Sequence, residues 1–269
     1  LQPQDLRTVL NLANVAQTAG QHATAQQLYM QLLKAHPNSP VVRRNLLATL
    51  QYNPDVSDHA LLLEAQYWGQ WATKQAGGPK ARPAMTGLTS VVNALPRPLR
   101  VGYVSADFCQ HTVGLFIMKV IEAHHQFLNE SPSSSGVEVF AYSSGRVSDW
   151  VTKDIQLNCT FKDVSTLSDA SLAQLIQEDQ IDVLVDLSGH TAGSRLTAFA
   201  YRPAPVQVSW LGYYATTGLD CIDAVVLDKW HAPLGTESQF TESIVRLEAG
   251  RFNFQPVPWA PNVSELPGA

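Results

Sequence analysis

From Leu99 onward, short apolar runs alternate with amphipathic stretches at helical spacing. The apolar runs that predict strands cover 99–105, 137–143, 181–187, 205–211, 221–228 and 243–248. Between them, 113–128, 168–179 and 195–201 favour helices. Strands that alternate with helices of about 10 to 15 residues imply right-handed crossovers and a parallel sheet. We therefore expect a Rossmann-like α/β domain over 99–254.

The first 54 residues carry a purely helical pattern. Small and apolar residues fall at the spacing of a tetratricopeptide repeat, a helix pair of about 34 residues. They are Leu12, Ala13, Ala16, Gly20, Ala25, Tyr29, Leu32 and Pro37. Leu46 lies one period after Leu12, so 41–50 is expected to begin another repeat. We interpret 1–54 as a remnant of a longer array; an ordinary helical hairpin is the alternative.

Residues 55–98 are expected to bridge these two parts. The segment 55–75 predicts an amphipathic helix capped by Ser57, with Trp68 on its apolar face. One or two repeats cannot cover that face, so we expect it to pack on the α/β domain. Residues 76–98 hold Gly-Pro and Arg-Pro steps typical of a linker. Residues 255–269 are again rich in proline, and we interpret them as a linker to a second domain absent from this chain.

Composition narrows the class of protein. Hydrophobic residues make up 45% and charged residues 15% of the chain, which is typical of a globular fold. The net charge of −5 argues against nucleic-acid or anionic-membrane binding. Three widely spaced cysteines indicate neither a disulfide framework nor a zinc site. No apolar stretch reaches the ~20 residues that a membrane span needs. The composition fits a cytoplasmic protein.

Three loops follow predicted strands, at the edge where parallel sheets bind ligands. They cover 105–112, 188–195 and 210–218. We expect His111 and His190 to open on one concavity there, with Thr191 nearby. A histidine with an unperturbed pKa of about 6.5 suits proton transfer at neutral pH. None of the loops matches a Walker loop, a dinucleotide fingerprint or a zinc-protease motif.

Three motifs in order carry a resemblance to a known family. They are Leu99-Arg-Val-Gly-Tyr-Val-Ser-Ala-Asp-Phe with His111, Ser188-Gly-His-Thr-Ala-Gly-Ser-Arg, and Tyr201-Arg-Pro-Ala-Pro-Val-Gln-Val-Ser-Trp-Leu-Gly-Tyr. Together they resemble the O-linked N-acetylglucosamine transferase family, glycosyltransferases with tetratricopeptide arrays that include the SPINDLY-type O-fucosyltransferases. Such enzymes pair two Rossmann-like domains in a GT-B arrangement. The resemblance reaches only the first of them, preceded here by the all-α tetratricopeptide-type segment.

The resemblance implies a fragment of a protein O-glycosyltransferase. In that family a Ser or Thr hydroxyl of an intracellular protein attacks a nucleotide sugar, here expected to be UDP-GlcNAc, with inversion. The implied partners are a polypeptide acceptor, recruited by the tetratricopeptide segment, and the nucleotide sugar as co-substrate. No cofactor, metal, nucleic acid or membrane is implied. The second domain supplies most nucleotide contacts in the family, so the chain alone is expected to be incomplete and inactive.

The same resemblance assigns the candidate site residues. They are His111 and His190 as catalytic residues, and Asp186, Thr191, Gly212, Tyr213, Thr216 and Thr217 as substrate-binding residues. His111 matches the family histidine proposed as a base or as an acceptor-orienting group. Asp186 either contacts the substrate or orients its loop by accepting backbone N–H bonds. Backbone N–H groups for a sugar or phosphate are expected from Gly212, Thr216, Thr217 and Gly218, with a plain tight turn as the alternative. Thr112 and Tyr214 stand where the bacterial family pattern usually has proline.

Rival functions remain open at this point. One is a non-catalytic protein-binding module built from a tetratricopeptide segment and a Rossmann-like scaffold. Another is an O-fucosyltransferase that uses GDP-fucose. A third is a two-domain glycosyltransferase for lipid or small-molecule acceptors, against which the tetratricopeptide pattern speaks because such arrays usually bind peptides.

Overall fold

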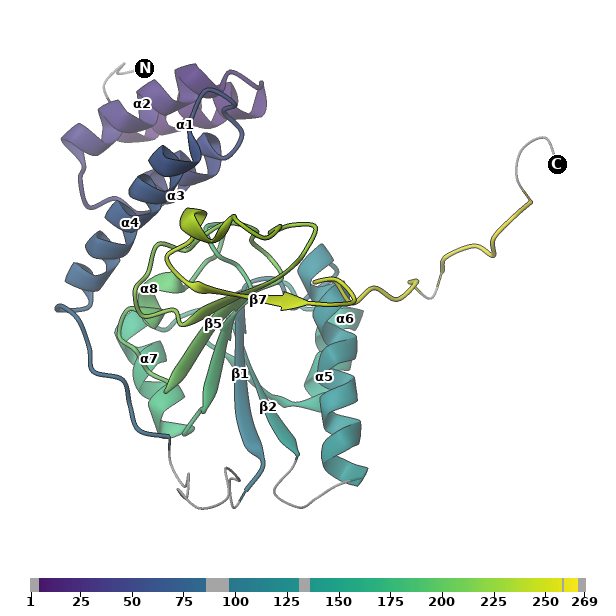
Figure 1. Cartoon of the computed structure of the whole chain (residues 1–269). Coiled ribbons are helices and arrows are strands. Elements are labelled where there is room, and N and C mark those ends of the chain that lie inside the picture. Colours follow the sequence, from purple (N-terminus) through teal and green to yellow (C-terminus); the bar gives the residue numbers. More distant parts are fainter. Residues whose placement is uncertain (1–4, 86–96, 131–135, 258, 266–269) are drawn as a thin grey trace.

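A seven-stranded sheet forms the centre of the computed structural model, which describes residues 5–85, 97–130, 136–257 and 259–265 (Figure 1). The strands are β1 (Leu99–Ser105), β2 (Val137–Ser143), β3 (Thr160–Asp163), β4 (Val183–Asp186), β5 (Val206–Trp210), β6 (Ala224–Asp228) and β7 (Ser243–Leu247). They lie in the order β3-β2-β1-β4-β5-β6-β7, and neighbouring strands pair in parallel. The strand order reverses between β1 and β4, which creates the crevice where such sheets bind ligands.

Helices cover both faces of this sheet (Figure 1). One face carries α5 (Thr112–Glu130) and α6 (Trp150–Asn158), and the other carries α7 (Asp169–Glu178) and α8 (Leu196–Phe199). The central strands are therefore buried on both faces, which explains their nearly continuous apolar sequence. The expectation of an α/β Rossmann-like fold after a helical segment is confirmed.

The sequence pattern missed two elements, α6 and β3. Helix α6 begins with a capping box in which Asp149 and Thr152 bond each other's backbone N–H groups, a signal that the hydrophobic pattern does not register. Strand β3 lies at the edge of the sheet and exposes Thr160 and Asp163. Edge strands lack the two-sided burial that makes central strands read as apolar runs.

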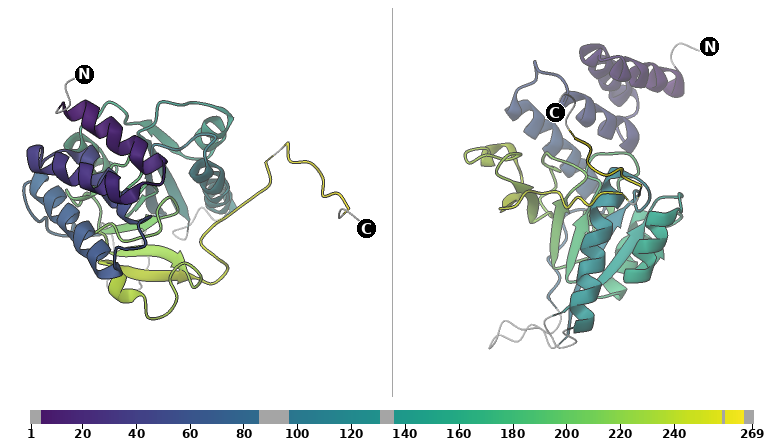
Figure 2. Two further views of the ribbon diagram at one scale, coloured as in Figure 1. Left: turned by 90° about the horizontal axis from the view of Figure 1, so that it is seen from above. Right: turned by 90° about the vertical axis from the view of Figure 1, so that its right-hand side faces the viewer.

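In the described part of the chain before the sheet, the helices are α1 (Leu6–Thr18), α2 (His22–Ala35), α3 (Pro40–Leu50) and α4 (Asp58–Gln75). They stack one on the next above the sheet (Figure 2). Gly20 turns the chain between α1 and α2 with a φ of 75°, a conformation that favours glycine. Ala13, Ala25 and Tyr29 are fully buried in this part, as their spacing predicts. Leu12, which falls at the same repeat spacing, is 56% exposed and lies outside this core.

Helix α4 joins the helical part to the sheet. Ser57 caps its first turn, as predicted. Trp68 is buried and shares one hydrophobic cluster with residues of the sheet and of α7 and α8. Beyond α4, the described residues 76–85 form no helix or strand, and Arg82 forms an ion pair with Asp223 beside β6. The expectation that the helices pack on the α/β domain is therefore confirmed. The predicted linker residues 86–96 lie outside the described residues.

Within the described residues, none of the helices has both the length and the apolar content needed to cross a membrane. Cys109, Cys159 and Cys221 are free thiols.

The tightest contact between the two parts generates a stability prediction. A Cβ atom on Gly69 of α4 would lie 1.8 Å from the carbonyl oxygen of Gly218. Helix propensity alone would make Gly69→Ala stabilising by about 1 kcal/mol. Because the backbones must separate to admit the methyl group, we expect the free energy of unfolding to fall by about 1–3 kcal/mol instead. Urea denaturation measures the change.

The matched control is Gln70→Ala on the exposed side of the same turn, which is expected to change stability by less than about 0.5 kcal/mol. A Gly69→Ala protein as stable as the wild type would show that α4 does not pack closely against the backbone at Gly218.

Candidate functional site

The turn after β4 is built around the buried carboxylate of Asp186. Its oxygens accept hydrogen bonds from the N–H groups of Ser188 (3.2 Å) and Gly189 (2.7 Å) and from the Ser209 hydroxyl (3.2 Å). Burial raises the pKa of Asp186 to about 6, although these bonds favour the charged form. The carboxylate thus accepts the N–H groups of its own loop, as the second of the two alternatives for this residue predicts. Asp186 is 1% exposed and is absent from the linings of the cavities described below, and its contact with a substrate stays a prediction.

His190, at the tip of that turn, lies between two aromatic rings. Its ring packs edge-on against Trp68 of α4, with 4.5 Å between ring centres, and against Tyr213, with 5.4 Å. Nε2 bonds the carbonyl oxygen of Thr217 at 2.9 Å. A carbonyl can only accept, so Nε2 carries the proton and Nδ1 is the ring's acceptor.

This environment keeps His190 neutral. The residue is only 2% exposed. Burial lowers its pKa to about 4; the bond to Thr217 acts in the opposite direction, and the nearby charge of Arg44 lowers the pKa further. A neutral imidazole buried in this way can position other groups, but it is poorly placed to exchange protons with solvent.

The loop after β5 lies against the turn after β4. Gly189 has a φ of 54°, and a Cβ there would lie 2.2 Å from Cβ of Tyr213. A Cβ on Gly212 would lie 2.0 Å from the carbonyl oxygen of Leu187. Both glycines are therefore required by close approach. Buried Arg251 donates from one guanidinium nitrogen to the carbonyl oxygens of Leu211 and Tyr213, at 2.6 and 2.8 Å. These two hydrogen bonds stabilise the conformation of the loop.

Thr216 and Thr217 are held by Glu242, which lies just before β7. One carboxylate oxygen accepts the Thr216 hydroxyl at 2.6 Å, and the other accepts the N–H of Thr217 at 2.7 Å and its hydroxyl. All three side chains are buried. The expectation that Thr217 offers its N–H to a sugar or phosphate is therefore wrong, because Glu242 occupies it. The sequence pattern did not identify Glu242.

His111 follows β1 and stands at the start of α5. Its side chain is 50% exposed, and Nδ1 lies 3.8 Å from a carboxylate oxygen of Asp107. The N–H of Val113 donates to the same Nδ1 at 3.3 Å. In the neutral ring this bond leaves the proton on Nε2, the ring nitrogen that has no such bond.

Cavities open beside these loops, and one of about 170 Å³ includes Thr216 and His231 in its lining. Two others contain the predicted histidines. The helix-side cavity, of about 330 Å³, is lined by Gln17, Arg44, Asn45, Ala48, Gln51, Tyr52, His190, Thr191, Ala192, Gly212, Tyr213 and Tyr214. The β1-side cavity, of about 280 Å³, is lined by His111, Thr112, Val113, Phe116, Leu211, Gly212, Tyr213, Tyr214, His231, Arg251 and Phe252. The segment 212–214 belongs to both linings, so the two cavities adjoin along it.

The two histidines thus do not open on one concavity as expected. His111 lines the β1-side cavity, whereas buried His190 lines the helix-side cavity together with Thr191. The segment 212–214, which lies between the two cavities, is kept in place by the close packing of Gly189 against Tyr213. This contact joins two loops, and no local sequence pattern indicates it. Sequence reasoning also missed Arg44 of α3 and Tyr52 in the turn after it, because it treated this segment as part of a peptide-binding array and not as a wall of the site.

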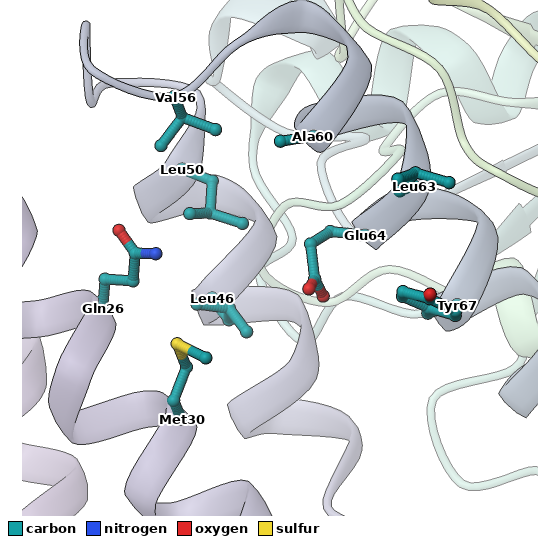
Figure 3. Close-up of a pocket in the computed structure, with 9 residues that line it drawn as sticks. All are labelled: Gln26, Met30, Leu46, Leu50, Val56, Ala60, Leu63, Glu64 and Tyr67. Carbon is teal, nitrogen blue, oxygen red and sulfur yellow. The ribbon is translucent and has the colours of Figure 1, made fainter.

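A separate apolar groove of about 180 Å³ lies on the helical part alone, between α2, α3 and α4 (Figure 3). Met30, Leu46, Leu50, Leu63 and Tyr67 are among its lining residues, with Glu64 pointing into it. It contains none of the predicted site residues, so the candidate site remains the pair of cavities at the strand ends.

Comparison with known proteins gives one family match and several relatives that are longer than this chain. The sequence profile described as "Glycosyl transferase family 41" matches residues 88–253. A probable UDP-N-acetylglucosamine–peptide N-acetylglucosaminyltransferase SPINDLY from Oryza sativa subsp. japonica is 34% identical over 242 residues, 90% of this chain and 25% of the rice protein. The probable enzyme SEC from Arabidopsis thaliana is 36% identical over 151 residues, 55% of this chain and 15% of that protein.

Among solved structures, the K341M mutant of the O-GlcNAc transferase from Thermobaculum terrenum superposes with a TM-score of 0.85 at 32% identity. The match covers 97% of this chain and 48% of the Thermobaculum chain. Our chain therefore spans about half of that structure and a quarter or less of the plant relatives.

The environment of His190 predicts its titration. With a folded pKa of about 4 and an unfolded value of about 6.5, the ring contributes stability above pH ~6.5 and loses it as the pH falls toward 4. NMR of histidine-labelled protein, with the signal assigned from its loss in His190→Gln, is expected to show no titration of His190 between pH ~8 and ~5. A midpoint near 6.5 would place the ring in solvent and contradict the packing described above.

Proposed function

Because the chain belongs to glycosyl transferase family 41, we propose that it is the acceptor-side part of a protein O-glycosyltransferase. It transfers N-acetylglucosamine from UDP-GlcNAc to polypeptides, as the names of its relatives suggest, and the family resemblance implies Ser or Thr hydroxyls as the acceptors. The chain spans only part of each relative, so the proposal includes a further Rossmann-like domain that completes the site. The same proposal includes a cytoplasmic location and recruitment of the polypeptide acceptor by residues 1–54, the tetratricopeptide-type segment.

One observation carries this proposal: the helix-side cavity is walled by both parts of the chain. Arg44 and Tyr52 come from the helical part, and Thr191 and Tyr214 come from the loops after β4 and β5. A polypeptide that lies along the helices therefore reaches the strand ends without leaving the surface. A binding module without catalysis would not need its helices to meet the crevice where α/β sheets hold ligands.

The two histidines receive different roles. His111 lines an open cavity with its Nε2 carrying the proton, so it donates to an oxygen of the bound acceptor or sugar and orients it for in-line attack. His190 is a positioning residue, because its neutral ring holds the 217 carbonyl and Tyr213 in place. The chemistry is mainly positioning and electrostatics, which supply much of the rate in group transfer.

The nature of the donor rests on the relatives. UDP-GlcNAc is favoured because both plant relatives carry that name, and GDP-fucose remains the second candidate from the resemblance. Nucleotide affinity needs N–H donors and cationic groups around the diphosphate. Among the described residues, the N–H of Thr217 is already bonded to Glu242, which supports a donor site formed mostly by the further domain.

The first prediction of this proposal concerns turnover. The full-length gene product that contains this chain is expected to transfer radiolabelled GlcNAc from UDP-GlcNAc to a Ser/Thr peptide, and the 269-residue chain alone is expected to show no appreciable turnover. Assays with UDP-GlcNAc and GDP-fucose in parallel identify the donor. Robust transfer by the 269-residue chain would contradict the proposal that a further domain is needed to complete the site. If the full-length protein transferred neither sugar, the enzymatic proposal itself would be contradicted.

The second prediction concerns His111. If the ring orients the acceptor, His111→Ala should act mainly on the acceptor KM, with kcat reduced less than about 100-fold. A general base would instead lose about 10²–10⁴-fold in kcat. The matched control is His36→Ala, an exposed histidine at the end of α2, which should leave both constants unchanged. Unchanged kinetics in His111→Ala would remove this residue from the site.

A further inference from the structure

Arg44 of α3 is a charged side chain without a charged partner. Among the residues that the structure describes, it forms no ion pair and no hydrogen bond. It is nevertheless half-buried, and burial lowers its pKa. Removing a guanidinium from water without a counter-charge is costly, so a protein that keeps one in this position gains something from it when a ligand is bound.

The neighbouring residue shows the contrast. Arg43 donates from Nε to the carbonyl oxygen of Pro37 at 2.9 Å, and its guanidinium lies 5.4 Å from the centre of the Trp71 ring. Arg43 therefore has a structural role at the end of α2. Arg44 points to the other side of α3 and lines the helix-side cavity.

Among the described residues that line that cavity, Arg44 is the one with a charged side chain. The other polar lining groups are neutral: amides such as Gln17 and Asn45, the hydroxyls of Tyr52 and Thr191, and the imidazole of His190, whose pKa is about 4. Asn45 is engaged, because its side-chain N–H donates to Asn14 at 3.0 Å. A cavity of about 330 Å³ with one cation and neutral donors around it fits a small anionic group.

We propose that Arg44 and the helix-side cavity form a subsite for an anionic side chain of the acceptor polypeptide, next to the hydroxyl that receives the sugar. The proposal rests on the proposed function and names its acceptor class: sequences with an acidic or phosphorylated residue near the modified Ser or Thr. A planar guanidinium can bind a carboxylate or a phosphate through two parallel N–H bonds. Aspartate, glutamate and phosphoserine share this chemistry.

The position of Arg44 favours the acceptor over the donor. The residue comes from the helical part, and Tyr213 and Tyr214 separate its cavity from the one that His111 lines. An acceptor that follows the helices meets Arg44 before it reaches the strand ends. Binding of the donor diphosphate by Arg44 is the competing outcome of the test.

The experiment measures peptide binding and needs no turnover. Fluorescence anisotropy follows short Ser peptides, identical except for Asp, phosphoserine or Asn at scanned positions around the Ser, on the 269-residue chain. The proteins are the wild type, Arg44→Gln and the control Lys34→Gln, which removes one positive charge from an exposed site on α2. Thermal unfolding checks that the variants are equally folded, and a UDP titration of each protein tests the donor alternative.

We expect at least one acidic or phosphorylated peptide to bind the wild type about 10-fold or more tighter than its Asn counterpart. Arg44→Gln should abolish this preference without weakening the Asn peptide, and Lys34→Gln should retain it. Asp and phosphoserine arms show which anion is preferred. Equal affinities for charged and neutral peptides, no binding of any peptide, a preference retained in Arg44→Gln, or an effect of Arg44→Gln on UDP alone would each overturn the proposal.

The transferase assay on a neutral peptide is independent of this result. Transfer by the full-length protein without any acidic preference would leave the proposed function standing and the subsite rejected. An acidic preference in binding without transfer would do the reverse.

Discussion

The buried ring of His190 is the contact on which the arrangement of the site depends. It touches Trp68 of α4, Tyr213 of the loop after β5 and the carbonyl of Thr217, so one neutral side chain joins the helical part to two loops of the sheet. Because the ring is neutral, this junction forms without an uncompensated buried charge. The family resemblance assigns His190 to the catalytic residues, and the contacts of its ring are packing against two aromatic rings and one hydrogen bond to a backbone carbonyl.

Buried charged groups elsewhere in the site serve the backbone. Asp186 accepts the N–H groups of its own turn, Glu242 accepts from Thr216 and Thr217, and Arg251 donates to the carbonyls of Leu211 and Tyr213. Each carries charge into the interior, and each is balanced by hydrogen bonds to fixed backbone or hydroxyl groups. The loops are therefore pre-organised. The side chains available to contact a ligand are those that line the cavities, among them His111 and Arg44.

The two cavities are lined by different candidate functional residues. Membership of glycosyl transferase family 41 establishes the class of protein, while the cavities give this chain its own features. Arg44 lines one cavity and His111 lines the other, with Tyr213 and Tyr214 in both linings. The proposed acceptor recognition and the proposed orientation of the reacting oxygen therefore fall to different cavities. The chain spans only part of each relative, and in the proposed function the helices and the sheet together form one side of the site.

The sequence by itself determined most of the fold. Strands β1 and β2 have the predicted bounds, and Ser57 caps α4 as expected, because two-sided burial and helix capping leave local patterns in the residues. The three motifs also placed their loops at one edge of the sheet. What the tertiary structure alone decided is which side chains face a cavity: His190 is buried by Trp68, Thr217 is occupied by Glu242, and Arg44 joins the site from α3. These outcomes arise from contacts between segments distant in the chain, and no spacing within one segment encodes them.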